Sequence, residues 1–112
     1  MVSERIRDRY LRDPLPVQLG GLAADLARMA SCAEDSRDRQ ALMSLMEEGK
    51  WFAEWAAEHA PLDVQEQLAE VQVWLACWEH RWLCGRLKPG LSEEAQRWSD
   101  CFLELSGLAG ER

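Results

Sequence analysis

The chain has 112 residues, of which 47% are hydrophobic and 29% are charged. This length and this balance are typical of one folded domain with its own core, and they exclude an intrinsically disordered chain. Asp and Glu outnumber Lys and Arg by 20 to 13, which gives a net charge of -7. Because nucleic acids and anionic membranes are bound through clustered positive charge, we expect neither as a partner.

The sequence also indicates where the protein resides. It contains no run of about 18 apolar residues, the length that a membrane-spanning helix requires. The charged first 13 residues contain no hydrophobic signal-peptide segment. We therefore expect a cytoplasmic protein, in which the four cysteines are free thiols rather than disulfides.

The first half of the chain shows the three-and-four spacing of amphipathic helices. Residues 1–13 are expected to form a short or flexible helical arm that carries Ile6, Tyr10 and Leu11. A first long helix is predicted by the series Leu15, Leu19, Leu22, Leu26, Met29 and Ala33. It contains Gly20 and Gly21, which we expect to let a neighbouring backbone come close. A second helix, capped by Asp35 or Ser36, carries Ala41, Leu45, Phe52, Ala56 and His59, widened by Leu42, Gly49 and Trp55.

Two further helices follow Pro61. Asp63 and Glu66 resemble a capping box at the start of the third, whose apolar residues are Val64, Leu68, Val71, Leu75, Trp78 and Trp82. Leu87–Gly90 ends it, and Ser92 caps a fourth helix with Leu91, Ala95, Trp98, Phe102, Leu105 and Ala109. No segment alternates as a strand would, and the connections are short. We therefore predict an all-α domain over 1–112, an antiparallel up-and-down four-helix bundle with a short N-terminal arm.

The third predicted helix has a second apolar face opposite its core residues. This face carries Val73, Cys77, Cys84 and Leu87, with Ala76 and Leu83 alongside. A helix that is apolar on two sides usually has two neighbours. Either the bundle places this helix centrally, or the second face meets another copy or another protein.

Six tryptophans add candidates for such a contact. Trp51 and Trp74 lie off the centres of their helical stripes and, if the second and third helices are antiparallel, at similar heights, where they could touch. Exposed indoles are enriched among binding hot spots. The predicted interaction surface therefore consists of Trp51, Val73, Trp74, Cys77 and Leu87.

The search for metal ligands and catalytic groups yields only weak candidates. Cys77 and Cys84 lie about 10 Å apart on one helix, too far for a single zinc ion, which leaves His80 and Cys84 as half a site. We expect no metal, no cofactor and no enzymatic activity, because no catalytic set is assembled. The remaining hydrolase hypothesis uses Glu48 and His59. Glu48 reaches solvent at the edge of the bundle, pairs with an arginine such as Arg28, or has a raised pKa in a pocket, whereas His59 is expected to be buried.

The pattern Leu15-Pro16-x-x-Leu19-Gly20-x-Leu22-Ala23-x-x-Leu26-Ala27-Arg28 resembles the opening of a family of small all-helical cyanobacterial proteins. The Glu54-Trp55 step, the turn from Pro61 to Val64 and the helix with Trp78 extend this resemblance to about residues 14–82. The resemblance implies a compact cytoplasmic fold and carries no activity. The sequence favours a non-enzymatic protein-protein interaction or assembly module that self-associates as a homodimer. The alternative is a bundle that binds a small ligand or a metal.

Overall fold

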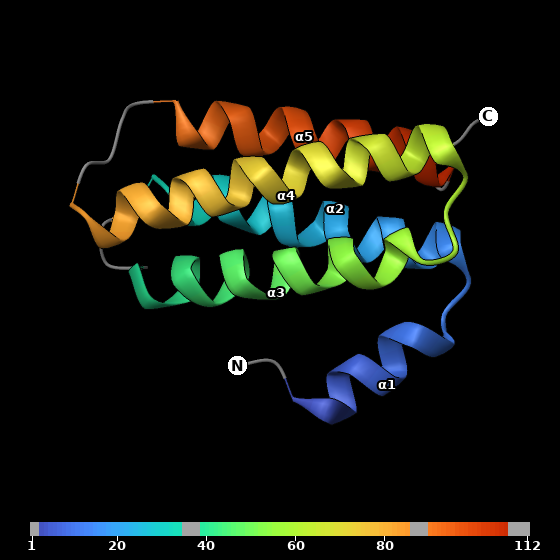
Figure 1. Cartoon of the computed structure of the whole chain (residues 1–112). Helices are drawn as coiled ribbons and strands as arrows, with labels where there is room; N and C mark the ends of the chain where they lie inside the picture. Colours follow the sequence, from blue (N-terminus) through green and yellow to red (C-terminus); the bar gives the residue numbers. More distant parts are fainter. Residues whose placement is uncertain (1–2, 35–38, 86–89, 108–112) are drawn as a thin grey trace.

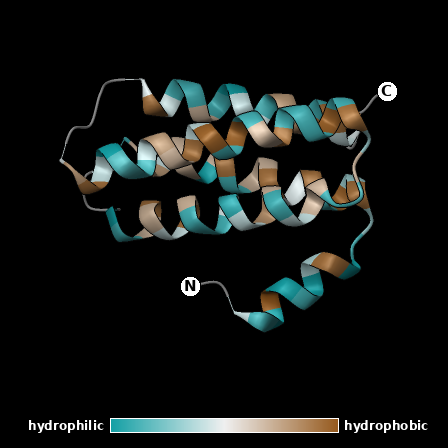
Figure 2. Cartoon of the chain, in the orientation of Figure 1, coloured by the Kyte–Doolittle hydropathy of each residue, from teal (hydrophilic) through white to brown (hydrophobic). Residues whose placement is uncertain are grey.

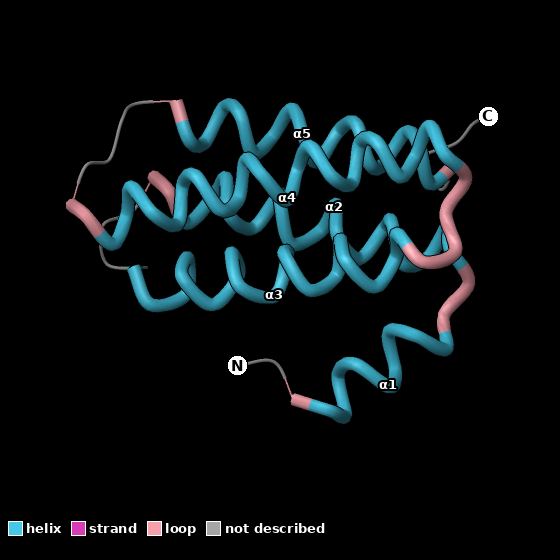
Figure 3. Tube along the Cα trace, viewed as in Figure 1, coloured by secondary structure: helices cyan, strands magenta, loops and turns pink. Residues whose placement is uncertain are grey.

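The structure is a computed structural model in which residues 3–34, 39–85 and 90–107 are described. Its helices are α1 (Glu4–Arg12), α2 (Leu15–Cys32), α3 (Arg39–Ala57), α4 (Leu62–Leu83) and α5 (Leu91–Ser106). No strand occurs within these ranges (Figure 3), which confirms the all-helical prediction. None of the helices described is both long enough and apolar enough to cross a bilayer.

The helices α2, α3, α4 and α5 lie lengthwise beside one another, and α1 is set apart at one end (Figure 1). The closest packing joins α2 to α5, α3 to α4 and α2 to α3. In contrast, α4 and α5 approach each other closely at few positions. One side of α4 therefore packs on α3, and a gap between α4 and α5 is left for large side chains.

The core lies where the apolar sides of these helices meet, and hydrophobic and hydrophilic stretches alternate along each long helix (Figure 2). The predicted core side of α4 is confirmed, since Trp82 is half-buried and the other five residues are buried: Val64, Leu68, Val71, Leu75 and Trp78. They meet a set of fully buried side chains from the other helices: Leu22, Leu26, Met29, Leu42, Met46 and Phe102.

The structure corrects the predicted core of α3 and α5. The buried side of α3 centres on Leu42 and Met46, whereas Ala41 is exposed. His59 is exposed too, because α3 ends at Ala57 and His59 lies in the following turn. On α5, Leu105 was predicted in the core but is exposed, whereas Ser99 and Ser106 are buried. Ser99 is tolerated in the core because its hydroxyl donates to the Ala23 carbonyl at 2.8 Å.

The predicted side-chain caps are wrong for α4 and α5. The residue before α4 is Pro61, and neither helix has a side-chain capping bond. Gly90 precedes α5 with a φ of 108°, a left-handed conformation that suits glycine. Ser92 lies inside α5 and donates instead to the Ala30 carbonyl at 2.8 Å, which links α5 to the end of α2. The cap candidates Asp35 and Ser36, and the Leu87–Pro89 part of the predicted helix stop, lie outside the described residues.

The predicted N-terminal arm is an ordered helix that is anchored by Tyr10. This ring is buried and stacks on Phe52 with centroids 4.0 Å apart. The Tyr10 hydroxyl donates to the Gln18 carbonyl at 2.7 Å, and the Gln18 amide donates back to the Tyr10 carbonyl at 3.0 Å. A Cβ at Gly21 would lie 3.5 Å from the Tyr10 ring. The close neighbour of this glycine is therefore a side chain, not the backbone that the sequence predicted.

Candidate functional site

The second apolar face predicted on the third helix is exposed in the structure. Leu83 is 71% exposed and Val73 is 64% exposed. We call this surface the outer face of α4; it comprises Leu62, Val73, Ala76, Cys77, Leu83 and Cys84, all of which are exposed. The alternative in which α4 is a central helix is therefore wrong for the described residues. Leu87, which was predicted on the same face, lies outside the described residues.

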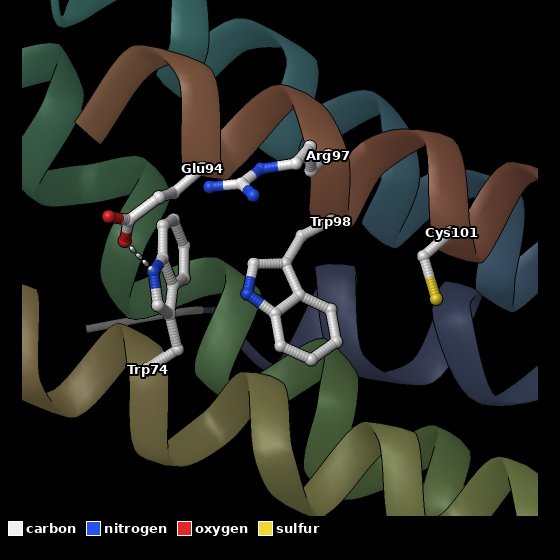
Figure 4. Close-up of a pocket in the computed structure, with 5 residues that line it drawn as sticks. All are labelled: Trp74, Glu94, Arg97, Trp98 and Cys101. Atoms are coloured by element: carbon white, nitrogen blue, oxygen red, sulfur yellow. Dashed lines mark hydrogen bonds between the residues drawn. The ribbon is translucent and has the colours of Figure 1, made fainter. Parts of the chain in front are cut away.

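Trp74 belongs to the contact between α4 and α5 rather than to the outer face. It is half-buried, and its ring lies 6.5 Å from that of Trp98, centroid to centroid. Figure 4 shows the two indoles side by side, and both line a pocket of about 330 Å³ together with Glu94, Arg97 and Cys101. We call this the tryptophan pocket.

Glu94 organises one side of the tryptophan pocket. Its Oε1 accepts hydrogen bonds from the indole nitrogens of Trp74 at 2.7 Å and of Trp78 at 3.1 Å. These hydrogen bonds, of which the bond from Trp74 has the larger effect, hold the pKa of Glu94 below its usual range. Burial raises the pKa of the Cys101 thiol, with Glu104 adding to the effect. The pocket thus presents a stable anion beside a protonated thiol that is a poor nucleophile.

Trp51 lies on α3 and stacks on Trp55 with ring centroids 5.7 Å apart. It is 39% exposed and lines a groove whose polar residues include Lys50 and Glu79, which form an ion pair between α3 and α4. Trp74 instead faces α5. The structure therefore separates Trp51 from Trp74, and the predicted contact between them is wrong.

His80 and Cys84 are neighbours at the end of α4. The Cys84 sulfur lies 3.6 Å from His80 Nε2, as expected for residues one helical turn apart. Within the described ranges there is no group of three or more His, Cys, Asp and Glu side chains that could hold a metal ion. The pair thus remains the two-ligand arrangement that the sequence predicted.

The carboxyl groups of a buried aspartate and a half-buried glutamate lie side by side between α2 and α3. Asp25 is 1% exposed, and its Oδ1 accepts from Arg28 Nη1 at 3.0 Å. Its Oδ2 is buried without a donor, beside the carboxyl of Glu48 on α3. A proton shared by the two carboxyl groups would supply the missing hydrogen bond. Burial, and then Glu48, raise the pKa of Asp25 from 3.8 to about 8, so that this carboxyl is mostly protonated at neutral pH.

Sequence reasoning identified Glu48 but missed its partner. Arg28 pairs with Asp25 rather than with Glu48. The signal was present, because Asp25 lies three residues after Leu22 and four before Met29, in phase with the core of α2. Glu48 and His59, the proposed hydrolase pair, do not form one site, because His59 lies in the exposed turn beyond the end of α3.

Comparison of the chain with protein-family models, curated proteins and solved structures finds no significant match. The resemblance of residues 14–82 to small cyanobacterial proteins therefore stays a prediction. Three features of the described residues bear on function: the outer face of α4, the tryptophan pocket and the carboxyl pair of Asp25 and Glu48.

Proposed function

We propose that this protein is a non-enzymatic, cytosolic interaction module that binds protein through the outer face of α4 and associates with itself. The observation that carries the proposal is the exposure of Leu62, Val73 and Leu83, each more than 60% exposed along one helix. Transfer of such a side chain from water into an interface is worth about 1.5–3 kcal/mol. Because these side chains are exposed to water in the single chain, their burial against a second apolar surface would release this free energy and favour the contact.

The proposal includes the arrangement of the helices as an antiparallel up-and-down bundle. Short connections between long helices favour antiparallel neighbours. The close packing of α2 with α3, and of α3 with α4, supports this arrangement, because each pair is consecutive in the chain. In such a bundle the side of α4 opposite its core residues faces outward over the full length of the helix.

The experiment that tests the proposal is sedimentation velocity over a wide range of protein concentration. Wild type is expected to shift toward a dimer as the concentration rises, whereas Val73→Asp stays monomeric because a carboxylate cannot be buried unpaired. Val17→Asp is the matched control, because Val17 is an exposed valine on α2, away from the outer face of α4. A strictly monomeric wild type, or equal weakening by both variants, would refute self-association through this face.

A second candidate function is the binding of a small ligand in the tryptophan pocket. The specific observation is that Trp74 and Trp98 face a space of about 330 Å³, at the lower end of the range for ligand pockets. A thermal-shift screen of small aromatic amines and carboxylates, repeated on Trp98→Leu, tests it. A hit that stabilises wild type and not the variant supports the candidate, and the absence of any such hit rejects it for these ligands.

A further inference from the structure

We infer that the partner of α4 is the α4 of a second copy, aligned antiparallel about a two-fold axis at Val73. This inference rests on the proposed function and specifies the geometry of its self-association. Seven exposed residues lie in one line along α4 and its C-cap, and we call this line the midline: Leu62, Glu66, Ala69, Val73, Cys77, His80 and Cys84. Apart from Val73, these residues form three pairs that lie four, seven and eleven positions before and after Val73. A two-fold axis at Val73 therefore maps the midline of one copy onto that of the other.

The charges on this midline select the antiparallel alignment. Glu66 and His80 each lie seven residues from Val73, about 10 Å along the helix. In the antiparallel pair, Glu66 of each copy lies beside His80 of the other, and both contacts form at once because the interface is isologous. A parallel pair would place Glu66 opposite Glu66 and His80 opposite His80. Two Glu66 carboxylates side by side repel, whereas an N–H of the His80 ring can donate to a Glu66 carboxylate, so complementarity favours the antiparallel dimer.

The ends of α4 reinforce this preference. Asp63 lies in its first turn, and His80 and Arg81 lie in its last turn. An antiparallel partner brings the acidic beginning of one helix to the basic end of the other, and it also opposes the two helix dipoles. In the dimer, His80 faces Glu66 of the second copy. Its own helix contributes the Cys84 thiol and Arg81, whose guanidinium lies over the Trp78 ring, 5.0 Å from its centroid.

The residues between the two charges permit close contact. In the dimer, Ala69 faces Cys77 of the second copy, and Val73 faces Val73 of the second copy. Small side chains therefore line the centre of the interface. At the ends, Leu62 faces Cys84. Helix axes approach to about 8–10 Å according to the side chains between them, and small ones favour the short distance. No bulky side chain lies on the midline between Glu66 and His80.

The size of the contact sets its expected strength. The 22 residues of α4 span about 33 Å. One helix pair of this length buries less than the roughly 800 Å² per partner of a standard stable interface. We therefore expect a rapidly exchanging dimer with a dissociation constant in the micromolar range or weaker, which must be measured at high protein concentration.

Charge exchange on the full chain tests the alignment. Glu66→Lys or His80→Glu alone, measured at about pH 6, is expected to weaken dimerisation about tenfold, because each replaces two complementary Glu66–His80 contacts. The double variant Glu66→Lys with His80→Glu restores opposite charges and is expected to dimerise within about threefold of wild type. Sedimentation equilibrium measures the four dissociation constants, those of wild type, the two single variants and the double variant.

Disulfide capture provides a second test that does not depend on charge. Under mild oxidation, Ala69→Cys is expected to yield a covalent dimer, because its new sulfur faces Cys77 of the second copy. The matched control combines Ala69→Cys with Cys77→Ser and should yield far less. Equal cross-linking in both variants would overturn the alignment, as would a double charge variant no stronger than the singles. Those results in a protein that still dimerises contradict the alignment alone, whereas a monomeric wild type contradicts the proposed function as well.

Discussion

Replacement of the buried Asp25 by asparagine should stabilise the protein at neutral and basic pH. Asparagine has nearly the same shape, and its carbonyl can still accept from Arg28 as Asp25 Oδ1 does. Its amide can donate to Glu48 without requiring a shared proton. The variant therefore keeps the contacts of the carboxyl pair and removes the group that must remain protonated in the fold.

The magnitude follows from the two pKa values. In the folded protein the pKa of Asp25 is raised from 3.8 to about 8, first by burial and then by Glu48. Between these pH values the unfolded chain is ionised while the folded chain keeps its proton. The free energy of unfolding therefore falls by about 1.4 kcal/mol per pH unit as the pH rises. The loss reaches about 4 kcal/mol near pH 7, and we expect Asp25→Asn to recover about 2–4 kcal/mol of it.

The assay is urea unfolding of wild type and Asp25→Asn at pH values from about 4 to 8. The two proteins should differ least at the acidic end, where a large part of the unfolded chains also carry the carboxyl proton, and should diverge steadily above it. Asp8→Asn, an exposed change on α1, is the matched control and should follow wild type. Parallel curves for wild type and Asp25→Asn across this range would refute the assigned pKa.

Two further predictions concern the hydrogen bonds that join helices. Tyr10→Phe removes the donor to the Gln18 carbonyl and should cost about 1 kcal/mol in urea unfolding, with faster proteolysis within α1. Unchanged proteolysis would show that the ring alone anchors the helix. Glu94→Ala leaves the indole nitrogens of Trp74 and Trp78 without their acceptor and should cost about 1–3 kcal/mol. Because the pKa of Glu94 is lowered, this difference should be present above the pKa of an ordinary glutamate and should shrink as the pH falls through the folded pKa.

The sequence predicted those features that depend on helical periodicity. The spacing from Val64 to Trp78 places these residues in the core as expected. It also places Val73 on the opposite side of the helix, but whether another helix of the chain covers Val73 was left open, and the structure shows that it is exposed. Burial of one helix side requires only that apolar residues recur every three or four positions, so it can be read without knowledge of the neighbouring helices. The outer face of α4 was identifiable for the same reason.

Features that depend on the neighbour of a residue were not predictable. Trp74 is half-buried because Trp98 and Glu94 meet it from α5, about 20 residues away in the chain. Ser92 has the composition of a cap, yet it bonds to Ala30, and only the docking of α5 on α2 creates that acceptor. The same holds for Asp25. Its position in the helical repeat of α2 indicates that it is buried, but its protonation depends on the carboxyl of Glu48 on another helix, which the sequence does not place beside it.

The sparse approach of α4 to α5 also affects the order in which the fold opens. These two helices are joined mainly through the indoles of Trp74 and Trp98 and through Glu94, whereas α2 and α5 pack closely along their backbones. Amide hydrogens of α4 should therefore exchange with solvent deuterium sooner than those of α2, since fewer tightly packed neighbours must separate. A helix that detaches first in this way would expose its core side together with its outer face, which makes α4 the expected element of any domain-swapped assembly.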